Sequence, residues 1–274
     1  MINDLILYYL RNFKIDYGKH IFEKQVKLPE NRKGIEFENP DGIKYVLDLT
    51  DHVMRQIYLK GVYERNTMRH LIKLARPDMT FMDVGANIGA YTLTMAKHLK
   101  QGKVISFEPN PRTINYLQRN IDLNGFKNIR IVDVGLSDKE EEVTLYTSSL
   151  TTASINKGKN TSEVEQIKLT TLDKFCSENN ISSIDLIKID IEGHEAKCLK
   201  GAEQMIAKSK EMVLIMEIDD NCKAVGLEKN ELFHSITDKG FKGFKPRGYP
   251  FKMEEIKDLS EDYVDNIIFV KGRF

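Results

Sequence analysis

Short apolar runs alternate with amphipathic stretches from residue 80 to the end of the chain. The runs have the length of buried strands, and the stretches between them carry apolar residues at helical spacing. This alternation predicts an α/β fold, in which crossover helices connect the strands of a parallel sheet. The predicted strands are Thr80–Val84, Lys103–Phe107, Ile129–Val132, Asp185–Ile189, Glu211–Ile218, Gly240–Phe244 and Asn266–Lys271.

The intervening stretches predict helices near residues 89–99, 111–123, 171–179, 195–208 and 229–239. The sheet is therefore expected to be seven-stranded and mostly parallel, with an antiparallel edge strand at the C-terminal end. The interval 143–170 interrupts the pattern with the polar segments Thr151–Ser154 and Asn156–Asn160. It predicts a short strand pair that flanks a mobile loop.

Residues 1–78 have a different pattern and are interpreted as an N-terminal extension to a main domain at residues 79–274. A helix is expected near residues 2–12. The strand-like runs Gly34–Glu38 and Lys44–Asp48 flank the turn signal Pro40–Gly42, which predicts a β-hairpin. Two further helices are expected near residues 51–60 and 65–75, before Pro77.

Composition narrows the class of protein. Lys+Arg and Asp+Glu both number 41, so the formal net charge is zero and no nucleic-acid partner is expected. The 30% of charged residues and a mean hydropathy of −0.40 favour a water-soluble chain. Three widely spaced cysteines, Cys176, Cys198 and Cys222, form neither a disulfide framework nor a zinc pattern, which favours a reducing, cytoplasmic setting.

The apolar start Met1–Leu10 is interrupted by Asp4 and followed by Arg11 and Lys14. A secretory signal places its positive charges first, and a membrane span needs about 20 apolar residues. We therefore expect an amphipathic helix here, with no signal peptide and no membrane span.

The stretch Phe81–Tyr91 carries the most informative motif, Asp-x-Gly-x-Asn-x-Gly, formed by Asp83, Gly85, Asn87 and Gly89. Glycines at this strand-to-helix turn let the backbone approach a ligand closely. A carboxylate at the strand tip would repel the pyrophosphate of a dinucleotide, but suits a ligand with an ammonium and a sulfonium group, S-adenosyl-L-methionine. A dinucleotide site and a purely structural turn are the weaker alternatives.

The next two strands add candidate contacts for the same ligand. Glu108, followed by Pro109, lies at a strand tip where a carboxylate can accept hydrogen bonds from both ribose hydroxyls. Ser137 and Asp138 follow the third strand and could flank an adenine ring, although an ordinary turn explains them equally well.

Together these motifs resemble the FkbM-type methyltransferases. The matching stretches are Gly61–Glu64, Asp83–Gly89, Phe107–Asn110, Leu136–Asp138, Thr171–Asp173, Asp185–Glu195 and Leu199–Ala202. They span about residues 60–220. One departure is His194, where similar sequences often carry a small or apolar residue.

The resemblance implies a Rossmann-like methyltransferase fold. It also implies transfer of a methyl group from S-adenosyl-L-methionine to a hydroxyl oxygen, which leaves S-adenosyl-L-homocysteine. The acceptors it implies are small molecules or glycans, that is, a sugar, a glycan or a secondary metabolite.

The acceptor side is expected at the tip of the fourth strand, where Asp190, Glu192 and His194 are the candidate catalytic residues. Asp190 could position the acceptor, take its proton or face the donor, and it is therefore also a candidate donor contact. His194 is a candidate base because its ordinary pKa lies near 6.5. Glu192 and Glu195 could equally cap the following helix. Asp190, Glu192 and Glu217 could bind Mg²⁺, but a polar pocket without metal is the preferred reading.

Two other classes of function stay open. The first is N-methylation of protein or nucleic acid, although Asp190–Gly193 stands where DNA amino-methylating enzymes carry an Asn/Asp-Pro-Pro-Tyr/Phe motif. The second is a catalytically inactive S-adenosyl-L-methionine-binding protein. Tyr63–Glu64 and Ser148–Ser154 are candidates for closing over the site, and Lys239–Arg247 is expected to be a solvated edge. The N-terminal extension could cover the acceptor pocket, form a homodimer contact, or do both.

Overall fold

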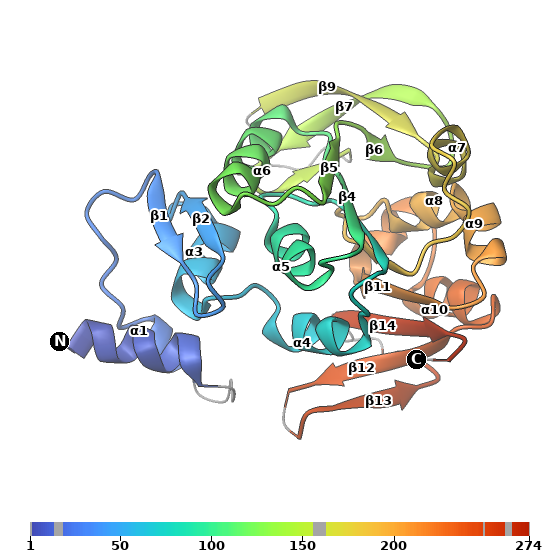
Figure 1. Ribbon diagram of the computed structural model, residues 1–274. Helices are drawn as coiled ribbons and strands as arrows, with labels where there is room; N and C mark the ends of the chain where they lie inside the picture. Colours follow the sequence, from blue (N-terminus) through green and yellow to red (C-terminus); the bar gives the residue numbers. More distant parts are fainter. Residues whose placement is uncertain (1, 14–18, 156–162, 249, 261–264, 274) are drawn as a thin grey trace.

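The computed structural model describes residues 2–13, 19–155, 163–248, 250–260 and 265–273; Asn156–Asn160 lie outside the described residues. The α/β fold is confirmed (Figure 1). The helices are α1 (Ile2–Asn12), α2 (Lys19–Glu23), α3 (His52–Lys60), α4 (Arg65–Leu74), α5 (Ala90–His98), α6 (Pro111–Asn124), α7 (Leu172–Glu178), α8 (Glu195–Lys200), α9 (Glu203–Lys208), α10 (Lys229–Thr237) and the 3-10 helix η1 (Asp220–Val225). The strands are β1 (Ile35–Glu38), β2 (Lys44–Leu47), β3 (Thr80–Val84), β4 (Lys103–Phe107), β5 (Ile129–Val132), β6 (Gly135–Leu136), β7 (Glu141–Thr147), β8 (Ala153–Ser154), β9 (Glu163–Thr170), β10 (Leu186–Ile189), β11 (Met212–Ile218), β12 (Lys242–Arg247), β13 (Lys252–Ile256) and β14 (Asp265–Lys271).

The central sheet has the strand order β13-β12-β14-β11-β10-β3-β4-β5. The strands from β11 to β5 run parallel, whereas β14, β12 and β13 are joined by antiparallel pairings. In the described residues the sheet thus has eight strands, one more than the seven predicted, and its antiparallel edge has three strands instead of one. The additional strand is β13, whose sequence Lys-Met-Glu-Glu-Ile lacks the apolar run of a buried strand.

Alternate residues of the parallel strands pack on opposite faces of the sheet. Phe81 and Val104 belong to one apolar cluster with residues of α4 and α5, whereas Met82 and Ile105 belong to another with residues of α7, α8, α9 and α10. Figure 1 shows these two helical layers on either side of the sheet. Because helices cover both faces of the sheet, these strands are mostly apolar, which is why the sequence pattern identified them.

The strand order reverses between β3 and β10. The chain runs outward from β3 to β4 and β5, and later returns to β10 on the other side of β3. Asp185 fastens this junction, since its Oδ2 atom accepts a hydrogen bond of 2.8 Å from the backbone N–H of Thr80. A crevice forms at the carboxyl ends of strands where the order reverses in this way.

A second, four-stranded sheet, β6-β9-β7-β8, replaces the short strand pair expected at 143–170. β7 and β9 pair antiparallel over their length, from Glu141 opposite Leu169 to Thr147 opposite Glu163. Their buried face, with Leu145, Ile167 and Leu169, forms a small apolar cluster. The prediction was too short because polar residues on the exposed faces of these strands outnumber the apolar ones.

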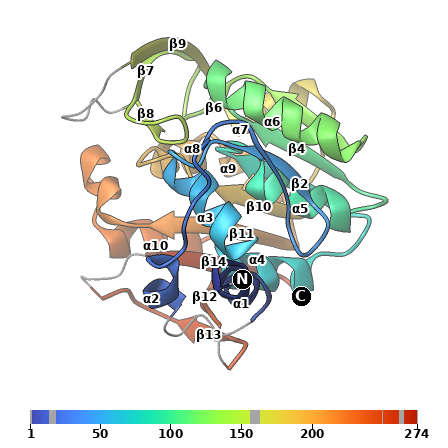
Figure 2. The same cartoon turned by 90° about the vertical axis from the view of Figure 1, so that its left-hand side faces the viewer.

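The N-terminal elements pack directly on the main domain. Leu47 of β2 and Ile57 of α3 share one apolar cluster with Leu93 of α5. The backbone N–H of Val46 also donates to Oδ1 of Asn120 in α6 at 2.7 Å. The hairpin and both following helices match the prediction, while α2 was not predicted. Figure 2 shows the hairpin and α3 from their own side of the molecule. The division at residue 78 stays a prediction.

The helix predicted at 195–208 is divided into α8 and α9 at Gly201 and Ala202. A Cβ on Gly201 would lie 1.9 Å from the carbonyl oxygen of Ser137, so the helix at this point packs closely against the segment that follows β6. The free cysteines Cys176 and Cys198 are buried nearby in the core. No helix in the described part of the chain combines the length and apolar character needed to span a bilayer.

Candidate active site

One cavity opens at the carboxyl ends of β3, β4, β10 and β11, where the strand order reverses. It joins the glycine-rich loop after β3 to the turn after β10, and the second sheet forms an apolar wall. Its lining residues include Val53, Tyr63, Asp83, Gly85, Asn87, Tyr91, Glu108, Pro109, Leu136, Leu145, Thr151, Ser154, Leu169, Lys188, Asp190, Glu192, His194 and Glu217. The cavity therefore brings predicted donor-side residues such as Asp83 and Glu108 together with the predicted acceptor-side residues Asp190, Glu192 and His194.

The loop after β3 has a backbone that only certain residues tolerate. Gly85 has φ of 78°, and a Cβ there would lie 2.0 Å from the carbonyl oxygen of Asp190. Asn87 also has positive φ, 53°, a conformation that asparagine adopts more readily than most residues. The backbone N–H groups of Gly85 and Ala86 both donate to the carbonyl of Phe107 at 3.0 Å. The motif glycine thus lets two loops of the site touch.

Asp83 is buried at the tip of β3, with 1% of its surface exposed. Its Oδ2 atom accepts a hydrogen bond of 2.6 Å from the hydroxyl of Thr92, which lies 2.7 Å from the hydroxyl of Ser106. The other oxygen, Oδ1, has no hydrogen-bond partner among the described residues. Burial raises the pKa of Asp83, although Lys188 and Thr92 oppose the rise. A buried acceptor without a partner is costly, so this atom is suited to a ligand cation.

Glu108 at the tip of β4 is held by the backbone of two loops. Oε2 accepts from the N–H of Asn87 at 2.8 Å, and Oε1 accepts from the N–H of Asn110 at 3.0 Å. Each carboxylate oxygen keeps a second acceptor position. Burial raises the pKa of Glu108 to about 7, against the lowering effect of these two hydrogen bonds.

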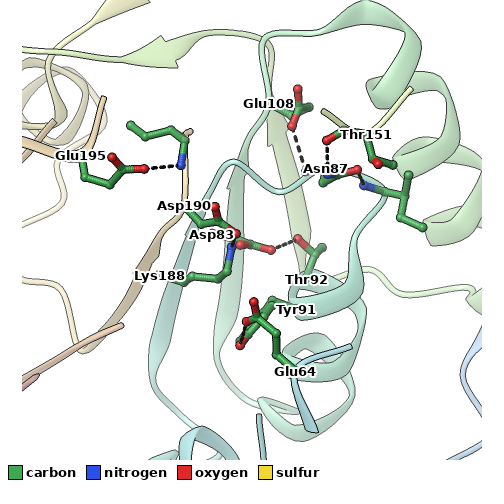
Figure 3. Close-up of polar contacts among 12 residues, drawn as sticks. Glu64, Asp83, Asn87, Tyr91, Thr92, Glu108, Thr151, Lys188, Asp190 and Glu195 are labelled. Atoms are coloured by element: carbon green, nitrogen blue, oxygen red, sulfur yellow. Dashed lines mark hydrogen bonds and ion pairs between the residues drawn. The ribbon is translucent and has the colours of Figure 1, made fainter. Parts of the chain in front are cut away.

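Lys188 links the two sides of the cavity (Figure 3). It lies opposite Asp83 in the β10–β3 register, and its Nζ atom is 2.9 Å from Oδ2 of Asp190. Nζ also lies 4.9 Å from the ring centre of Tyr91, whose hydroxyl donates to Glu64 at 2.6 Å. Burial lowers the pKa of Lys188, but the carboxylates of Asp190, Asp83 and Glu64 outweigh it and raise the pKa overall. The lysine is therefore a fixed buried cation.

The acceptor side of the cavity is acidic. Burial, Asp190 and Asp219 raise the pKa of Glu217 to about 8. Partial desolvation, with Asp190 and Glu195, raises the pKa of Glu192 to about 7, even though Glu192 is solvent-exposed as a whole. Two carboxyl groups beside Asp190 can therefore change protonation near neutral pH.

His194 lines the cavity, but its ring is buried and already engaged. Nε2 lies 2.9 Å from the hydroxyl of Ser137. Burial and Lys197 lower the pKa of His194, so the ring is neutral at pH 7. Ser137 contacts the histidine but does not itself line the cavity in the described chain. Asp138 forms an ion pair with Lys200 at 3.2 Å. It too is absent from the described residues that line the cavity, whereas Leu136 is among them. Gly89, the last motif glycine, contacts Leu117 of α6 instead of the cavity.

The turn after β10 is organised by Glu195. Its Oε1 atom accepts from the N–H groups of Ile191 and Gly193, at 2.9 and 3.2 Å. This leaves Glu192 with a positive φ of 54°. The strand ends at Ile189, so the turn and not strand alternation places Glu192 near Asp190. Of the two predicted capping candidates, Glu195 holds the turn through its side chain.

Sequence reasoning missed Lys188, Tyr91 and Thr92 as site residues. A signal for Lys188 was present, because it is the charged residue in the apolar strand Leu-Ile-Lys-Ile. Tyr91 and Thr92 look like ordinary helix residues, and their role depends on the packing of α5 against β3. Within the described residues, no group of three or more His, Cys, Asp or Glu side chains is arranged to hold a metal ion.

Known proteins similar to this chain include two methyltransferases, a hexuronic acid methyltransferase and a 2-O-methyltransferase. This chain is 27% identical over 158 residues to hexuronic acid methyltransferase AglP of Haloferax volcanii, and the alignment covers 58% of this chain and 63% of that protein. It is 25% identical over 154 residues to 2-O-methyltransferase NoeI of Sinorhizobium fredii, covering 50% of this chain and 63% of that protein. The chain thus spans less than two thirds of these relatives.

Among solved structures, M. jannaschii TYW2 in complex with AdoMet is similar with a TM-score of 0.47, 12% sequence identity and 90% of each chain covered. The profile described as the methyltransferase FkbM domain matches residues 83–242, more than half of the sequence. That match begins at Asp83 of the glycine-rich loop and includes the turn at Asp190. The chain belongs to the FkbM methyltransferase family.

Proposed function

We propose that this protein transfers a methyl group from S-adenosyl-L-methionine to a hydroxyl oxygen of a saccharide, glycan or secondary metabolite. The observation that carries the proposal is the single cavity that joins the glycine-rich loop to Asp190, Glu192 and Glu217. Family membership supports the reaction, the name of the relative NoeI supports transfer to a hydroxyl oxygen, and the name of the relative AglP supports a sugar acceptor.

The residues of the loop side fit the donor. Oδ1 of Asp83 would accept a hydrogen bond from the ammonium group, since it is a buried acceptor without a partner in the described chain. The carboxylate of Glu108 would accept hydrogen bonds from the ribose hydroxyls. Pro109, Leu136 and Leu169 offer an apolar wall for the adenine ring. When bound, the donor supplies an electrophilic methyl group on a sulfonium that is already a good leaving group.

The residues of the acceptor side would align the hydroxyl and remove its proton. Lys188 binds Oδ2 of Asp190, which fixes this carboxylate and leaves Oδ1 to orient the acceptor hydroxyl. Glu192 is the base in this proposal, because its pKa of about 7 matches an operating pH near neutrality. His194 is a second candidate, although its Nε2 atom is engaged with Ser137.

The first experiment is calorimetric titration with S-adenosyl-L-methionine and S-adenosyl-L-homocysteine. Wild-type protein should bind both at micromolar concentration, and the Asp83→Ala/Glu108→Ala double variant should lose that binding while staying folded. A folded wild-type protein that binds neither compound would overturn the proposal, most clearly if NAD bound instead.

The acceptor is tested by methyl transfer to a panel of hydroxylated sugars. Asp190→Asn and Glu192→Gln should each lower kcat by about 10²-fold or more, while the Kd for S-adenosyl-L-homocysteine stays within about threefold. If the protein binds the donor but transfers no methyl group to any acceptor, the result would favour a donor-binding protein without turnover. Transfer only to amino groups would replace the O-methylation proposal with N-methylation.

A further inference from the structure

A segment that includes β8 of the second sheet lines the donor cavity. We call residues Ser148–Ile155, between β7 and β9, the strap. Thr151, Thr152, Ala153 and Ser154 of the strap all line the cavity. Its far end contacts the acceptor turn, where the hydroxyl of Ser154 donates to the carbonyl of Glu192 at 3.1 Å. The strap therefore touches both sides of the site.

Asp51, in the N-terminal region, holds this strap. It is buried, with 5% of its surface exposed. Its Oδ2 atom accepts from the hydroxyl of Thr151 at 2.6 Å, from the N–H of Thr151 at 3.2 Å and from the hydroxyl of Ser149 at 3.3 Å. Its Oδ1 atom caps α3 by accepting from the N–H of Met54 at 3.2 Å. One carboxylate thus joins helix and strap across 100 residues of sequence.

The strap is fastened to the donor loop as well. Nδ2 of Asn87 donates to the carbonyl of Thr151 at 2.9 Å, and the hydroxyl of Thr113 donates to the carbonyl of Leu150 at 3.1 Å. The N–H of the same Asn87 donates to Glu108. A continuous series of hydrogen bonds therefore runs from Asp51 through Thr151 and Asn87 to Glu108.

We propose that Asp51 is a positioning residue of the donor site, which sets the loop at Asn87 and Glu108 through Thr151. This inference rests on the proposed function, because it concerns the binding of the same donor. It makes the N-terminal region part of the site: Asp51 holds the strap, and Val53 and Tyr63 line the cavity. Without Asp51, the buried N–H and hydroxyl of Thr151 lose their partner, and the strap has to move to regain one.

The test is a double-mutant cycle between Asp51→Ser and Thr151→Val, read out as the Kd for S-adenosyl-L-homocysteine. Serine retains an N-cap acceptor for α3 but is too short to reach the strap. Each single variant should weaken binding about tenfold, the equivalent of one buried hydrogen bond. The double variant should bind no more weakly than Asp51→Ser alone, because Asp51→Ser already removes the contact with the Thr151 hydroxyl that Thr151→Val removes. Asp51→Asn, which keeps one side-chain oxygen, should recover part of the affinity.

Asp48→Ser is the matched control. Asp48 is a buried carboxylate in the same segment, and its Oδ1 atom accepts only from the N–H and hydroxyl of Thr50 among the bonds described. The Asp48→Ser variant should change Tm about as much as Asp51→Ser does, but it should leave the Kd for S-adenosyl-L-homocysteine unchanged. Unchanged affinity in Asp51→Ser, or losses that multiply in the double variant, would overturn the inference. Wild-type protein that binds no S-adenosyl-L-homocysteine would instead remove the proposed function itself.

Discussion

At the scale of single residues, the site contains charged side chains whose burial costs free energy because it removes them from water. Asp83 has a raised pKa and an oxygen without a partner in the described residues, and Lys188 is enclosed by acidic and aromatic groups. Natural sites keep such unfavourable groups where a ligand makes use of them. At Asp83, stability and ligand binding should therefore respond to substitution in opposite directions.

Asp83→Asn separates the two effects. The amide has nearly the same shape but no charge, so ligand-free protein should gain a few degrees in Tm because burial disfavours the aspartate charge. The same change should weaken S-adenosyl-L-methionine binding by about tenfold or more, since it removes the partner of the ammonium group. Thermal melts and titration on one preparation measure both. A lower Tm with unchanged affinity would contradict this assignment.

Lys188→Met should lower the free energy of unfolding much more than the small change in side-chain volume suggests. It leaves the carboxylates of Asp83, Asp190 and Glu64 without their buried cation, and breaking such a pair costs about 3–5 kcal/mol. Urea unfolding measures the loss. The control is Lys200→Met, because Lys200 is 69% exposed in its pair with Asp138 and its removal should cost under about 1 kcal/mol. Equal losses in both variants would show that Lys188 is not a buried partner.

At the scale of elements, periodicity predicted most of the main sheet. β3, β4 and β5 begin and end where the sequence indicated, because each is a short, mainly apolar run. β13 and the second sheet were harder to predict. β13 lies at an edge of the main sheet, and β7 of the second sheet buries only alternate side chains, so charged residues interrupt the apolar pattern in segments such as Glu141–Thr147.

Some site residues could likewise be predicted from the sequence, whereas others depend on contacts between distant segments. Asp83, Glu108 and Asp190 could be predicted because each ends a strand at one edge of the sheet. The contact of Asp51 with Thr151 could not, since it joins residues 100 positions apart and neither lies in a recognisable motif. Ser137 and His194 form a pair 57 positions apart for which the sequence gives no signal.

Gly85→Ala tests the turn between β3 and α5. The added Cβ would meet the carbonyl of Asp190, at 2.0 Å, in a backbone conformation that alanine disfavours. Donor binding should fall by about 10²-fold or more, because the loop must move away from the turn after β10. Gly125→Ala is the control: φ is 67°, but no atom lies within 4 Å. It should cost about 1 kcal/mol in stability and keep the affinity. Similar affinities in the two variants would contradict the close approach.

At the scale of the whole molecule, burial raises the pKa values of several carboxyl groups of the site. Glu108 titrates at about 7 in the folded chain, against an ordinary value of 4.5. A carboxyl with a raised folded pKa stabilises the fold below its unfolded pKa, and this contribution is lost as pH rises through the folded pKa. Ligand-free protein should therefore lose up to a few kcal/mol of stability between about pH 4.5 and 8.

Glu108→Gln should flatten this pH dependence, since glutamine does not titrate. The free energy of unfolding, measured in urea at a series of pH values, gives the comparison with wild type. Glu254→Gln is the control, because Glu254 lies on β13 and its pKa is lowered by Arg247, so it does not titrate in this range. A wild-type stability that rises from pH 5 to 8 would contradict the burial of Glu108.

The reversal of strand order between β3 and β10 also has a kinetic consequence. The bond between Thr80 and Asp185 joins residues 105 positions apart, and the pairing of β3 with β10 beside it brings the two halves of the cavity together. Closing long loops is slow and precedes the contacts that stabilise them. A chain that has folded its first half therefore still lacks Lys188 and Asp190. During refolding, the ability to bind donor should return at the rate of the slowest global phase.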